Sequence, residues 1–330
     1  MSRFRTGLVV GKFAPLHLGH EFVIRAALAR CDQVVLLSYS NPEFPGCEPG
    51  RRTSWLAARF PDTIRIVLSA TDESIPDNSA SDEAHRAFSA AVIARRTGLL
   101  IDAIFTSEDY GPGFAADLAR RQRSPVVHLA VDHARLNVPV SGTRLRSDIH
   151  GCRRFLSHEV YASFVERIGL LGGESTGKST LAVALADSLG TVHVAEYGRE
   201  LWDRRDGRLA FPDLLTIARE QIRREDAAVF SERARRFIVC DTTPLTTLFY
   251  SLDLFAAADP ALAALAGRAY AHTFLCEDDF PFFQDGTRRS EVFRSKQQAW
   301  YRQRLFATPH CIVSGPVDER IRTIRGVLKL

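Results

Sequence analysis

Short apolar runs rich in β-branched residues alternate with longer amphipathic segments along the whole chain of 330 residues. Runs of about four to eight such residues are typical of buried strands, and apolar positions at helical spacing indicate the helices that cross between them. An alternation of this kind predicts parallel sheets covered by helices. The pattern therefore favours an α/β fold with two parallel-sheet domains in series.

The two halves of the chain give similar sets of expected elements. In the first half, strands are expected at residues 8–11, 33–40, 64–70, 103–107 and 126–131. Helices are expected there at 19–30, 53–60, 82–96 and 114–121. In the second half, strands are expected at 167–171, 191–195, 237–240, 273–277 and 311–314. Its helices are expected at 178–188, 213–234, 245–255, 292–306 and 317–328.

The boundary between the domains is best placed just before the second half's first strand. We expect one domain over residues 1–150, a helical connector over 151–166, and a second domain over 167–330. The connector is predicted as a helix because residues 153–165 carry several apolar positions and no proline or glycine. Residues 41–52, a polar stretch with three prolines, are expected to form a loop near a substrate.

Composition limits the kinds of partner and location. The hydrophobic fraction of 45% and the charged fraction of 25% are ordinary for a globular protein, and a net charge of +4 requires no nucleic-acid partner. The six cysteines include no C-x-x-C pair, and no apolar run is long enough for a signal peptide or a membrane span. We expect a cytoplasmic protein that binds no nucleic acid and has no membrane span, with a homo-oligomer possible.

A first phosphate-binding motif lies at residues 11–20, GKFAPLHLGH, directly after an apolar run. Gly19 lets the backbone approach a ligand closely, and the helix expected there points free N–H groups at an anion. The imidazoles of His17 and His20 can bond phosphate oxygens and stabilise charge that develops at phosphorus. Lys12 adds a cation on the same loop.

A second group of residues belongs with this motif, although it lies far along the chain. Ser141, Gly142 and Thr143 begin another expected helix, and Arg146 lies one turn into it. Their hydroxyl and N–H groups can hold terminal phosphates, with the guanidinium beside them.

A P-loop pattern, GGESTGKS, occupies residues 172–179 between an expected strand and an expected helix. Its backbone N–H groups are expected to cradle phosphates, while Lys178 reaches the β- and γ-phosphate oxygens and Ser179 binds Mg²⁺. The predicted nucleotide-binding residues of this loop are Gly172, Gly173, Glu174, Ser175, Thr176, Gly177, Ser179 and Thr180.

Three further residues complete this second predicted site. Glu196 follows the next strand along the chain, beside the P-loop in the expected sheet, where a carboxylate can accept the proton of an attacking hydroxyl. Asp241 ends an apolar strand, the arrangement that places a carboxylate near Mg²⁺. Arg288 lies in a polar stretch before a helix and is expected to bring a guanidinium to the transferring phosphate.

The motifs of the first half resemble those of the H-x-G-H nucleotidyltransferase superfamily, G-x-F-x-P-x-H-x-G-H and a later I-S-S-T-x-x-R, of which residues 140–146 are a degenerate copy. The resemblance implies a Rossmann-like domain in which a substrate phosphate attacks the α-phosphorus of a nucleoside triphosphate in line and pyrophosphate leaves. By this resemblance, His17 and His20 bind the reacting phosphates, and Lys12 and Arg146 bind the pyrophosphate.

The second half resembles P-loop ribosylnicotinamide kinases, and the order of both halves resembles the bifunctional NadR family. The resemblance rests on residues 172–180, 196–200, 241–243, 285–288 and 295–297 of the second half. In the first half it rests on FTSE at 105–108, the pair Asp132 and Arg135, and Arg52-x-x-Trp55-Leu56. It implies nucleotide contacts at Gly11, Phe13, Gly19, Ser107, Ser141, Gly142 and Thr143. It implies substrate contacts at Arg52, Trp55, Tyr197 and Arg199.

The resemblance to the NadR family also implies a pair of reactions. The kinase would phosphorylate nicotinamide riboside with ATP and Mg²⁺, and the other domain would join the mononucleotide to AMP from ATP, giving NAD. Some members carry an N-terminal helix-turn-helix domain, for which the chain before its first strand is too short, so no DNA binding is expected. Residues 76–88, where related enzymes commonly place a tryptophan on the nicotinamide ring, contain none, and Trp55 can instead be a core residue.

Three alternatives remain open at this point. The same two reactions can act on another vitamin-derived acceptor, such as a flavin or pantetheine phosphate. The first domain can sense nucleotides in a regulatory protein without turnover, although intact His17, His20 and Arg146 argue against this. A P-loop NTPase that acts as a switch would hydrolyse ATP slowly without an acceptor, whereas a kinase would consume ATP only when the acceptor is added.

Overall fold

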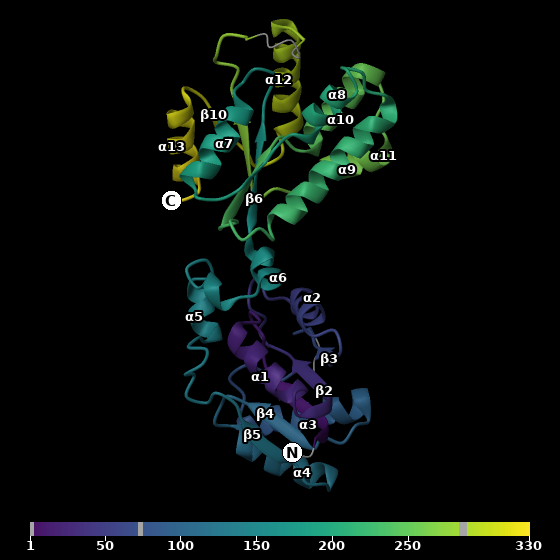
Figure 1. Cartoon of the computed structure of the whole chain (residues 1–330), viewed down its shortest axis with the longest axis vertical. Helices are drawn as coiled ribbons and strands as arrows, with labels where there is room; N and C mark the ends of the chain where they lie inside the picture. The colour runs from purple at the N-terminus through teal and green to yellow at the C-terminus, as the bar shows by residue number, and fades with distance from the viewer. Residues whose placement is uncertain (1–2, 72–74, 284–288) are drawn as a thin grey trace. The chain divides into compact units, whose positions relative to one another are not determined.

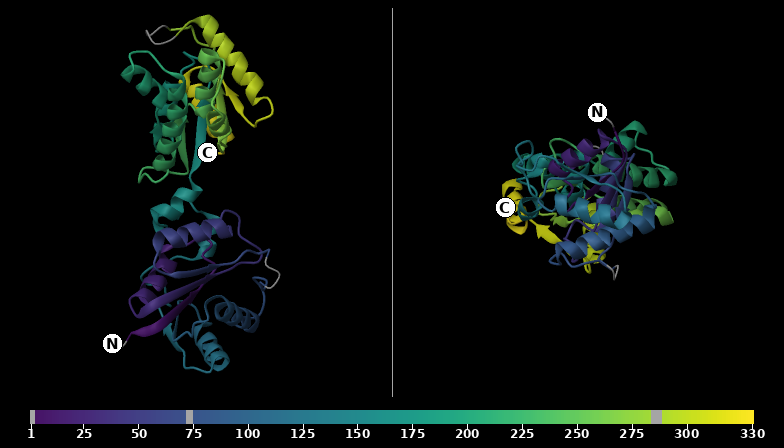
Figure 2. Two further views of the ribbon diagram at one scale, coloured as in Figure 1. Left: turned by 90° about the vertical axis from the view of Figure 1, so that its right-hand side faces the viewer. Right: turned by 90° about the horizontal axis from the view of Figure 1, so that it is seen from below.

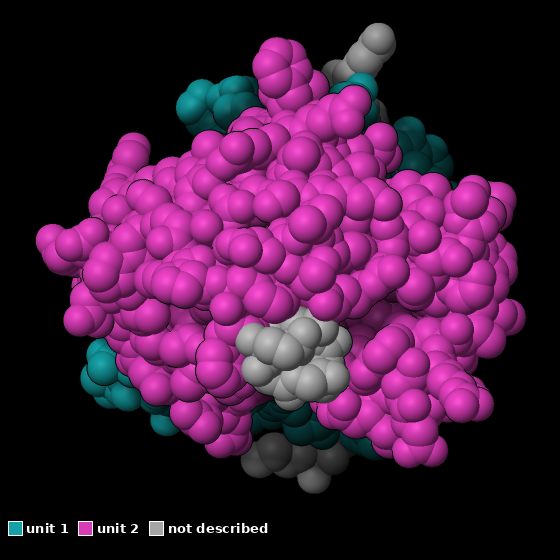
Figure 3. Space-filling view, turned by 90° about the horizontal axis from the view of Figure 1, so that it is seen from above, with its two compact units in different colours: residues 1–164 teal, residues 165–330 magenta. Residues whose placement is uncertain are grey.

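The computed structural model describes residues 3–71, 75–283 and 289–330. It divides into two compact units, Met1–Phe164 and Val165–Leu330, which Figure 3 colours teal and magenta. Each unit is built around one five-stranded parallel sheet, so the expected α/β fold with two parallel-sheet domains is confirmed. Residues 151–164 belong to the first unit. Arg288 lies outside the described residues.

The sheet of the first unit has the strand order β3-β2-β1-β4-β5, and all its pairs are parallel. Its strands are β1 (Phe4–Val10), β2 (Cys31–Ser38), β3 (Ile64–Val67), β4 (Ala103–Thr106) and β5 (Val127–Ala130). The order reverses between β1 and β4, the point where ligands bind in doubly wound sheets. The sequence motif that follows β1 is therefore at the position where this fold forms a site.

Helices cover both faces of this sheet (Figure 2). The helices are α1 (Leu18–Leu28), α2 (Pro49–Arg59), α3 (Asp82–Thr97), α4 (Gly111–Gln122) and α5 (Gly142–Ser147). Apolar residues of α3 and α4 share one core with the sheet, which includes Leu8, Val35, Ile93 and Phe114. Helix α2 begins at Pro49, so residues 49–52 are helical and not part of the loop expected over 41–52.

The second unit has the strand order β10-β9-β6-β8-β7, again with parallel pairs throughout. Its strands are β6 (Glu166–Leu171), β7 (His193–Val194), β8 (Phe237–Asp241), β9 (His272–Cys276) and β10 (Cys311–Val313). The P-loop strand β6 therefore lies between β8 and β9. Strand β7, which we expected beside β6, forms the edge of the sheet beyond β8.

Two groups of helices sandwich the second sheet (Figure 1). Helices α7 (Lys178–Ser188) and α13 (Val317–Val327) share one core with it. The other core is formed with α8 (Tyr197–Arg204), α9 (Phe211–Ala228), α10 (Pro244–Phe255), α11 (Pro260–Ala266) and α12 (Glu291–Leu305). The helices α8 and α11 were not expected from the sequence.

The expected single helix over residues 153–165 is not formed. The segment contains a 3₁₀ turn, Arg153–Phe155, the one-turn helix α6, His158–Tyr161, and a second 3₁₀ turn, Ala162–Phe164. Leu156 and Ser157 are extended between the first turn and α6, which interrupts the hydrogen-bond ladder of a helix. The apolar residues that suggested a helix are buried by this irregular path instead. Among the described residues, no helix is long and apolar enough to cross a membrane.

Two candidate nucleotide sites

The first candidate site is a cavity of about 530 Å³ at the carboxyl end of the first sheet. Its walls include the loop after β1, the start of α1 and the start of α5. The structure thus brings two distant motifs together. Expected site residues that line this cavity are Gly11, Lys12, Phe13, His17, Gly19, His20, Ser107, Ser141, Gly142, Thr143 and Arg146.

The two histidines of this site stack on each other, with ring centroids 3.6 Å apart and planes at 19°. The backbone N–H of His20 donates to Nδ1 of His17 over 3.3 Å. Because Nδ1 of His17 accepts, its proton lies on Nε2, where it can be donated to a phosphate oxygen. A side chain at Gly19 would lie 3.1 Å from the His17 ring, a tight contact that would require the ring to shift.

Burial and nearby arginines keep both imidazoles neutral. Burial, with Arg135 and Arg146, lowers the pKa of His17 to about 4. Burial and the neighbouring His17 hold the pKa of His20 well below its usual value. Burial also lowers the pKa of Lys12. At neutral pH the histidines therefore act as hydrogen-bonding groups, and the positive charge comes from the arginines and Lys12.

The start of α5 forms the opposite part of this site. Ser141 is the N-cap of α5 and accepts a hydrogen bond from the Arg144 N–H over 3.2 Å. The guanidinium of Arg146 donates to the Ala14 carbonyl over 2.6 Å and to the Thr143 hydroxyl over 3.1 Å. Arg146 is thereby tied to the loop after β1. The free N–H groups of α5 and this guanidinium can hold the same anion.

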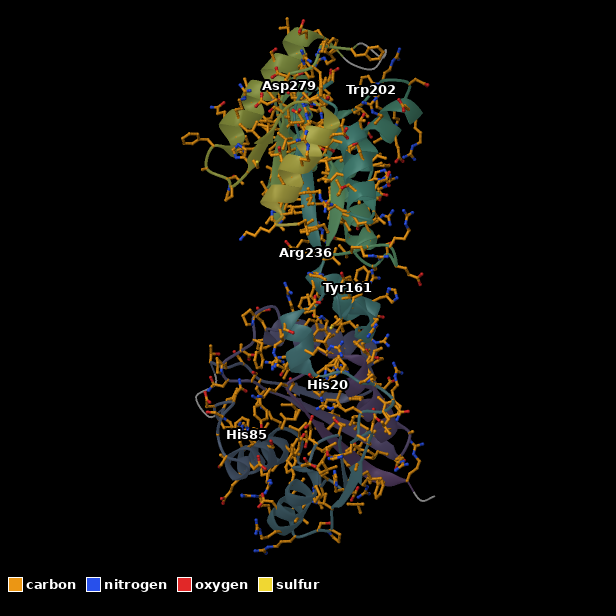
Figure 4. The ribbon with its side chains drawn as sticks, turned by 90° about the vertical axis from the view of Figure 1, so that its left-hand side faces the viewer. His20, His85, Tyr161, Trp202, Arg236 and Asp279 are labelled. Atoms are coloured by element: carbon orange, nitrogen blue, oxygen red, sulfur yellow. The ribbon has the colours of Figure 1, made fainter. Side chains whose placement is uncertain are left out.

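The cavity also contains a polar cluster that the sequence did not indicate. The Tyr39 hydroxyl lies 3.1 Å from Nδ1 of His85 and 3.2 Å from the Ser89 hydroxyl. Figure 4 labels His20 and His85, which both belong to the first unit. Tyr39 follows β2 and the other two residues lie on α3, so only the packing of α3 on the sheet brings them together. No local sequence motif predicts such a cluster.

Arg52 and Trp55, expected to contact substrate, have a different position. Both are buried and neither lines the cavity. Arg52 donates to the Leu68 carbonyl over 3.0 Å and pairs with Glu43 at 2.8 Å, and it reaches the Lys12 carbonyl at 3.3 Å. The Trp55 indole N–H donates to the Ser163 hydroxyl over 2.8 Å. Arg52 thus supports the Lys12 loop through its carbonyl, and Trp55 is a core residue.

The second candidate site is a cavity of about 280 Å³ around the loop between β6 and α7. Within the P-loop, the Lys178 ammonium donates to the Gly173 carbonyl over 2.7 Å, and the Thr176 hydroxyl donates to the same oxygen over 2.8 Å. Expected site residues that line this cavity are Glu174, Ser175, Thr176, Gly177, Lys178, Ser179, Thr180, Glu196 and Arg199. Gly172, Gly173, Tyr197 and Asp241 are not among the residues that line it.

Glu196, the N-cap of α8, and Asp241, the last residue of β8, lie close enough for their charges to interact. Burial and the charge of Asp241 raise the pKa of Glu196 to about 7, which suits a general base. Asp241 is buried, and its Oδ1 accepts no hydrogen bond from any described residue. The next residue, Thr242, has a φ of 69°, an uncommon conformation for a β-branched residue and one that gathers at functional sites.

The donor set at this point fits Mg²⁺. A carboxylate oxygen without a partner, a serine hydroxyl at the P-loop and the phosphates of a nucleotide are ligands that Mg²⁺ prefers. The described residues contain no group of three or more His, Cys, Asp or Glu side chains arranged to hold a metal. A magnesium ion carried by a nucleotide needs no such group, because phosphate and water supply the remaining ligands.

Tyr197 and Arg199 occupy opposite sides of α8. Tyr197 is buried, its N–H donates to Gln221 Oε1 over 2.9 Å, and its ring lies under the Arg224 guanidinium at 4.5 Å. A direct contact of the Tyr197 ring with substrate does not fit this position. Arg199 lines the cavity together with Trp202, which is labelled in Figure 4.

Sequence reasoning missed Tyr250 and Arg320, two residues that contact the P-loop, whereas Arg289 belongs to the polar stretch expected near the phosphate. The Tyr250 hydroxyl donates to Glu174 Oε1 over 2.9 Å, and the Arg289 N–H donates to Glu174 Oε2 over 2.8 Å. The Arg320 guanidinium, also buried, donates to the Thr176 carbonyl over 2.7 Å and pairs with Asp279. Tyr250 comes from α10, Arg320 from α13 and Arg289 from the segment just before α12, so only tertiary packing places them at the P-loop.

The fold and the two sites define a chain that joins a Rossmann-like unit with an H-x-G-H motif to a P-loop unit. Comparison with known proteins agrees with this class. A family model described as an AAA domain matches residues 167–320. The "Trifunctional NAD biosynthesis/regulator protein NadR" of Salmonella typhimurium is 27% identical over 301 residues, covering 86% of this chain and 71% of the relative. The protein of the same name from Escherichia coli is 26% identical over 304 residues, with the same coverage.

Two solved structures match nearly the whole chain. A crystal structure of a NadR protein in complex with NAD and AMP-PNP has a TM-score of 0.72 at 18% identity and covers 100% of this chain and 98% of its own. A second, in complex with NR, has a TM-score of 0.70 at 17% identity, with coverage of 99% and 96%. The expected resemblance to the NadR family is confirmed by these relatives together.

Proposed function

We propose that this chain phosphorylates nicotinamide riboside and then adenylylates the mononucleotide to NAD. The observation that carries the proposal is the presence of two separate phosphate sites, each at the carboxyl end of its own parallel sheet. The similarity to NadR proteins, one of them bound to NAD and AMP-PNP and another to NR, supports this assignment over other acceptors.

The kinase step belongs to the second unit. Glu196 accepts the proton of the riboside 5′-hydroxyl, whose oxygen attacks the γ-phosphorus of ATP. The bond between that phosphorus and the leaving ADP oxygen breaks, so the products are the mononucleotide and ADP. Lys178 and the N–H groups at the start of α7 hold the phosphate charge. Asp241 and Ser179 would hold Mg²⁺, which would supply positive charge to neutralise the phosphates.

The adenylyl transfer belongs to the first unit. An oxygen of the mononucleotide phosphate attacks the α-phosphorus of a second ATP, and the bond to the pyrophosphate oxygen breaks. His17 donates a hydrogen bond from Nε2 to the α-phosphate, and His20 stacks beside it. Lys12 and Arg146 balance the charge on pyrophosphate. Catalysis in this unit rests on positioning and charge stabilisation, without a covalent intermediate.

One experiment tests both steps. Purified protein is incubated with nicotinamide riboside, ATP and Mg²⁺, and the mixture is separated by chromatography. The proposal expects mononucleotide and ADP first, then NAD and pyrophosphate. ATP consumption without added riboside would favour a P-loop switch instead. If adenylyl transfer occurred to a flavin or pantetheine phosphate and not to nicotinamide mononucleotide, the proposed acceptor of the first unit would be wrong.

A further inference from the structure

The P-loop of the second unit is crowded by helix α12. A side chain at Gly173 would lie 2.8 Å from the Arg294 carbonyl and 3.0 Å from Arg294 Cγ. Gly173 is therefore a glycine because α12 packs against it. At the same end, a side chain at Gly172 would lie 2.7 Å from the Cys276 carbonyl of β9. Side chains at these two glycines would therefore collide with the backbone of β9 and α12, which both pack closely against the first half of the loop.

Two adjacent glutamines of α12 complete this contact. Gln298 Oε1 accepts the Gly173 N–H over 2.9 Å, and Gln297 Oε1 accepts the Glu174 N–H over 2.9 Å. The Gln298 amide also donates to the Cys276 carbonyl over 3.0 Å. Both glutamines are buried, at 1% and 2% exposure. The hydrogen bond of Gln298 is buried, whereas that of Gln297 is part-buried at the wall of the cavity, which Gln297 lines.

These hydrogen bonds separate the backbone N–H groups of the loop into two sets. The N–H groups of Gly173 and Glu174 are used by α12, whereas those at the start of α7 have no partner within the helix and remain for an anion. A buried N–H group without an acceptor is costly, so the loop would rearrange if the glutamine oxygens were lost. We propose that Gln297 and Gln298 are positioning residues that hold the P-loop in its phosphate-binding form before nucleotide arrives.

The inference rests on the proposed nucleotide site of the second unit but not on the identity of its acceptor. It is tested by replacing each glutamine with methionine, Q297M and Q298M, which keeps the length of the side chain and removes its hydrogen bonds. Q303M is the matched control, because Gln303 is an exposed residue of the same helix. Binding of Mg·ADP is measured by calorimetry on the full chain, with the melting temperature and the adenylyltransferase activity recorded on the same samples.

Loss of one such hydrogen bond is expected to raise the Mg·ADP dissociation constant by about tenfold, while Q303M is unchanged. The KM for ATP in the kinase reaction is expected to rise with it, and adenylyl transfer is expected to stay normal. A purely structural role would lower the melting temperature and the active fraction but leave the dissociation constant of the folded fraction unchanged, which would overturn the proposal. Because Mg·ADP binding needs no acceptor, inactivity of the wild type on nicotinamide riboside would count against the proposed function alone.

Discussion

The rate of the kinase step is expected to depend on pH through Glu196. The rate of adenylyl transfer is not expected to depend on pH through the site histidines. Burial and the charge of Asp241 raise the pKa of Glu196 to about 7. The active form of a general base is the deprotonated one, so kinase activity rises with pH through this value. His17, with a pKa of about 4, stays neutral across the same range, as does His20.

The size of the effect follows from the pKa of Glu196. With a value of about 7, the carboxylate is deprotonated in about a tenth of molecules at pH 6 and about nine-tenths at pH 8. The kcat/KM for riboside is therefore expected to rise about tenfold between these two pH values. A glutamate with its ordinary pKa would be deprotonated throughout and would give a flat profile.

The assay compares both activities of one preparation across pH 6 to 8 at constant free magnesium. Phosphorylation of the riboside and adenylylation of supplied mononucleotide are followed separately by chromatography. Glu196→Gln is expected to lose about a hundredfold or more of kinase activity and all of its pH dependence. Asp241→Asn removes the second cause of the raised pKa, so its residual activity is expected to have a lower midpoint and a weaker response to magnesium.

Two results would refute this reasoning. A wild-type kinase profile that is flat from pH 6 to 8 would mean that Glu196 is not the base. A Glu196→Gln variant that regains its rate at higher magnesium, while Asp241→Asn does not, would exchange the roles of the two carboxylates.

Four other substitutions give separable outcomes. Lys178→Ala is expected to reduce riboside phosphorylation about a hundredfold or more and to leave NAD synthesis from supplied mononucleotide nearly intact; equal loss of both would refute independent sites. His20→Ala is expected to lower kcat of adenylyl transfer far more than it raises KM, measured by steady-state kinetics, whereas Ser141→Ala is expected to be milder because backbone donors of α5 remain. Arg52→Met is expected to destabilise the first unit by about 3–5 kcal/mol, measured by urea unfolding, because it removes the cation that pairs with Glu43 and the donor to the Leu68 carbonyl; unchanged stability would return Arg52 to a substrate-binding role.

The parts of the sites that could be predicted are those written as short local patterns. A strand followed by a helix start with the right residues between them specifies its own geometry, as in residues 11–20 and 172–179. The strand ranges also follow from local apolar runs, and most of them differ from the structure by only a few residues at each end. The reason is that strand, turn and helix cap depend on neighbours in sequence.

The parts that could not be predicted depend on packing between distant elements. Arginine side chains are usually exposed, but Arg52 is fully buried. Its burial is possible because Glu43 and the carbonyl groups of Leu68 and Lys12 accept its hydrogen bonds. Strand β7 contains two residues, too few for a pattern to show its place at the edge. The segment expected as one connector helix was misjudged because its apolar residues are buried without a helical repeat.

The contact between α12 and the P-loop constrains how this chain can change during evolution. Ser290 caps α12, and its hydroxyl accepts the Phe293 N–H over 3.1 Å, which fixes where the helix starts. Each helical residue advances by about 100°, so inserting or deleting one residue between this cap and Gln297 would turn both glutamines away from the loop. Changes of length between Ser290 and Gln298 are therefore expected to be disfavoured. A family alignment is expected to show no gaps between these two positions.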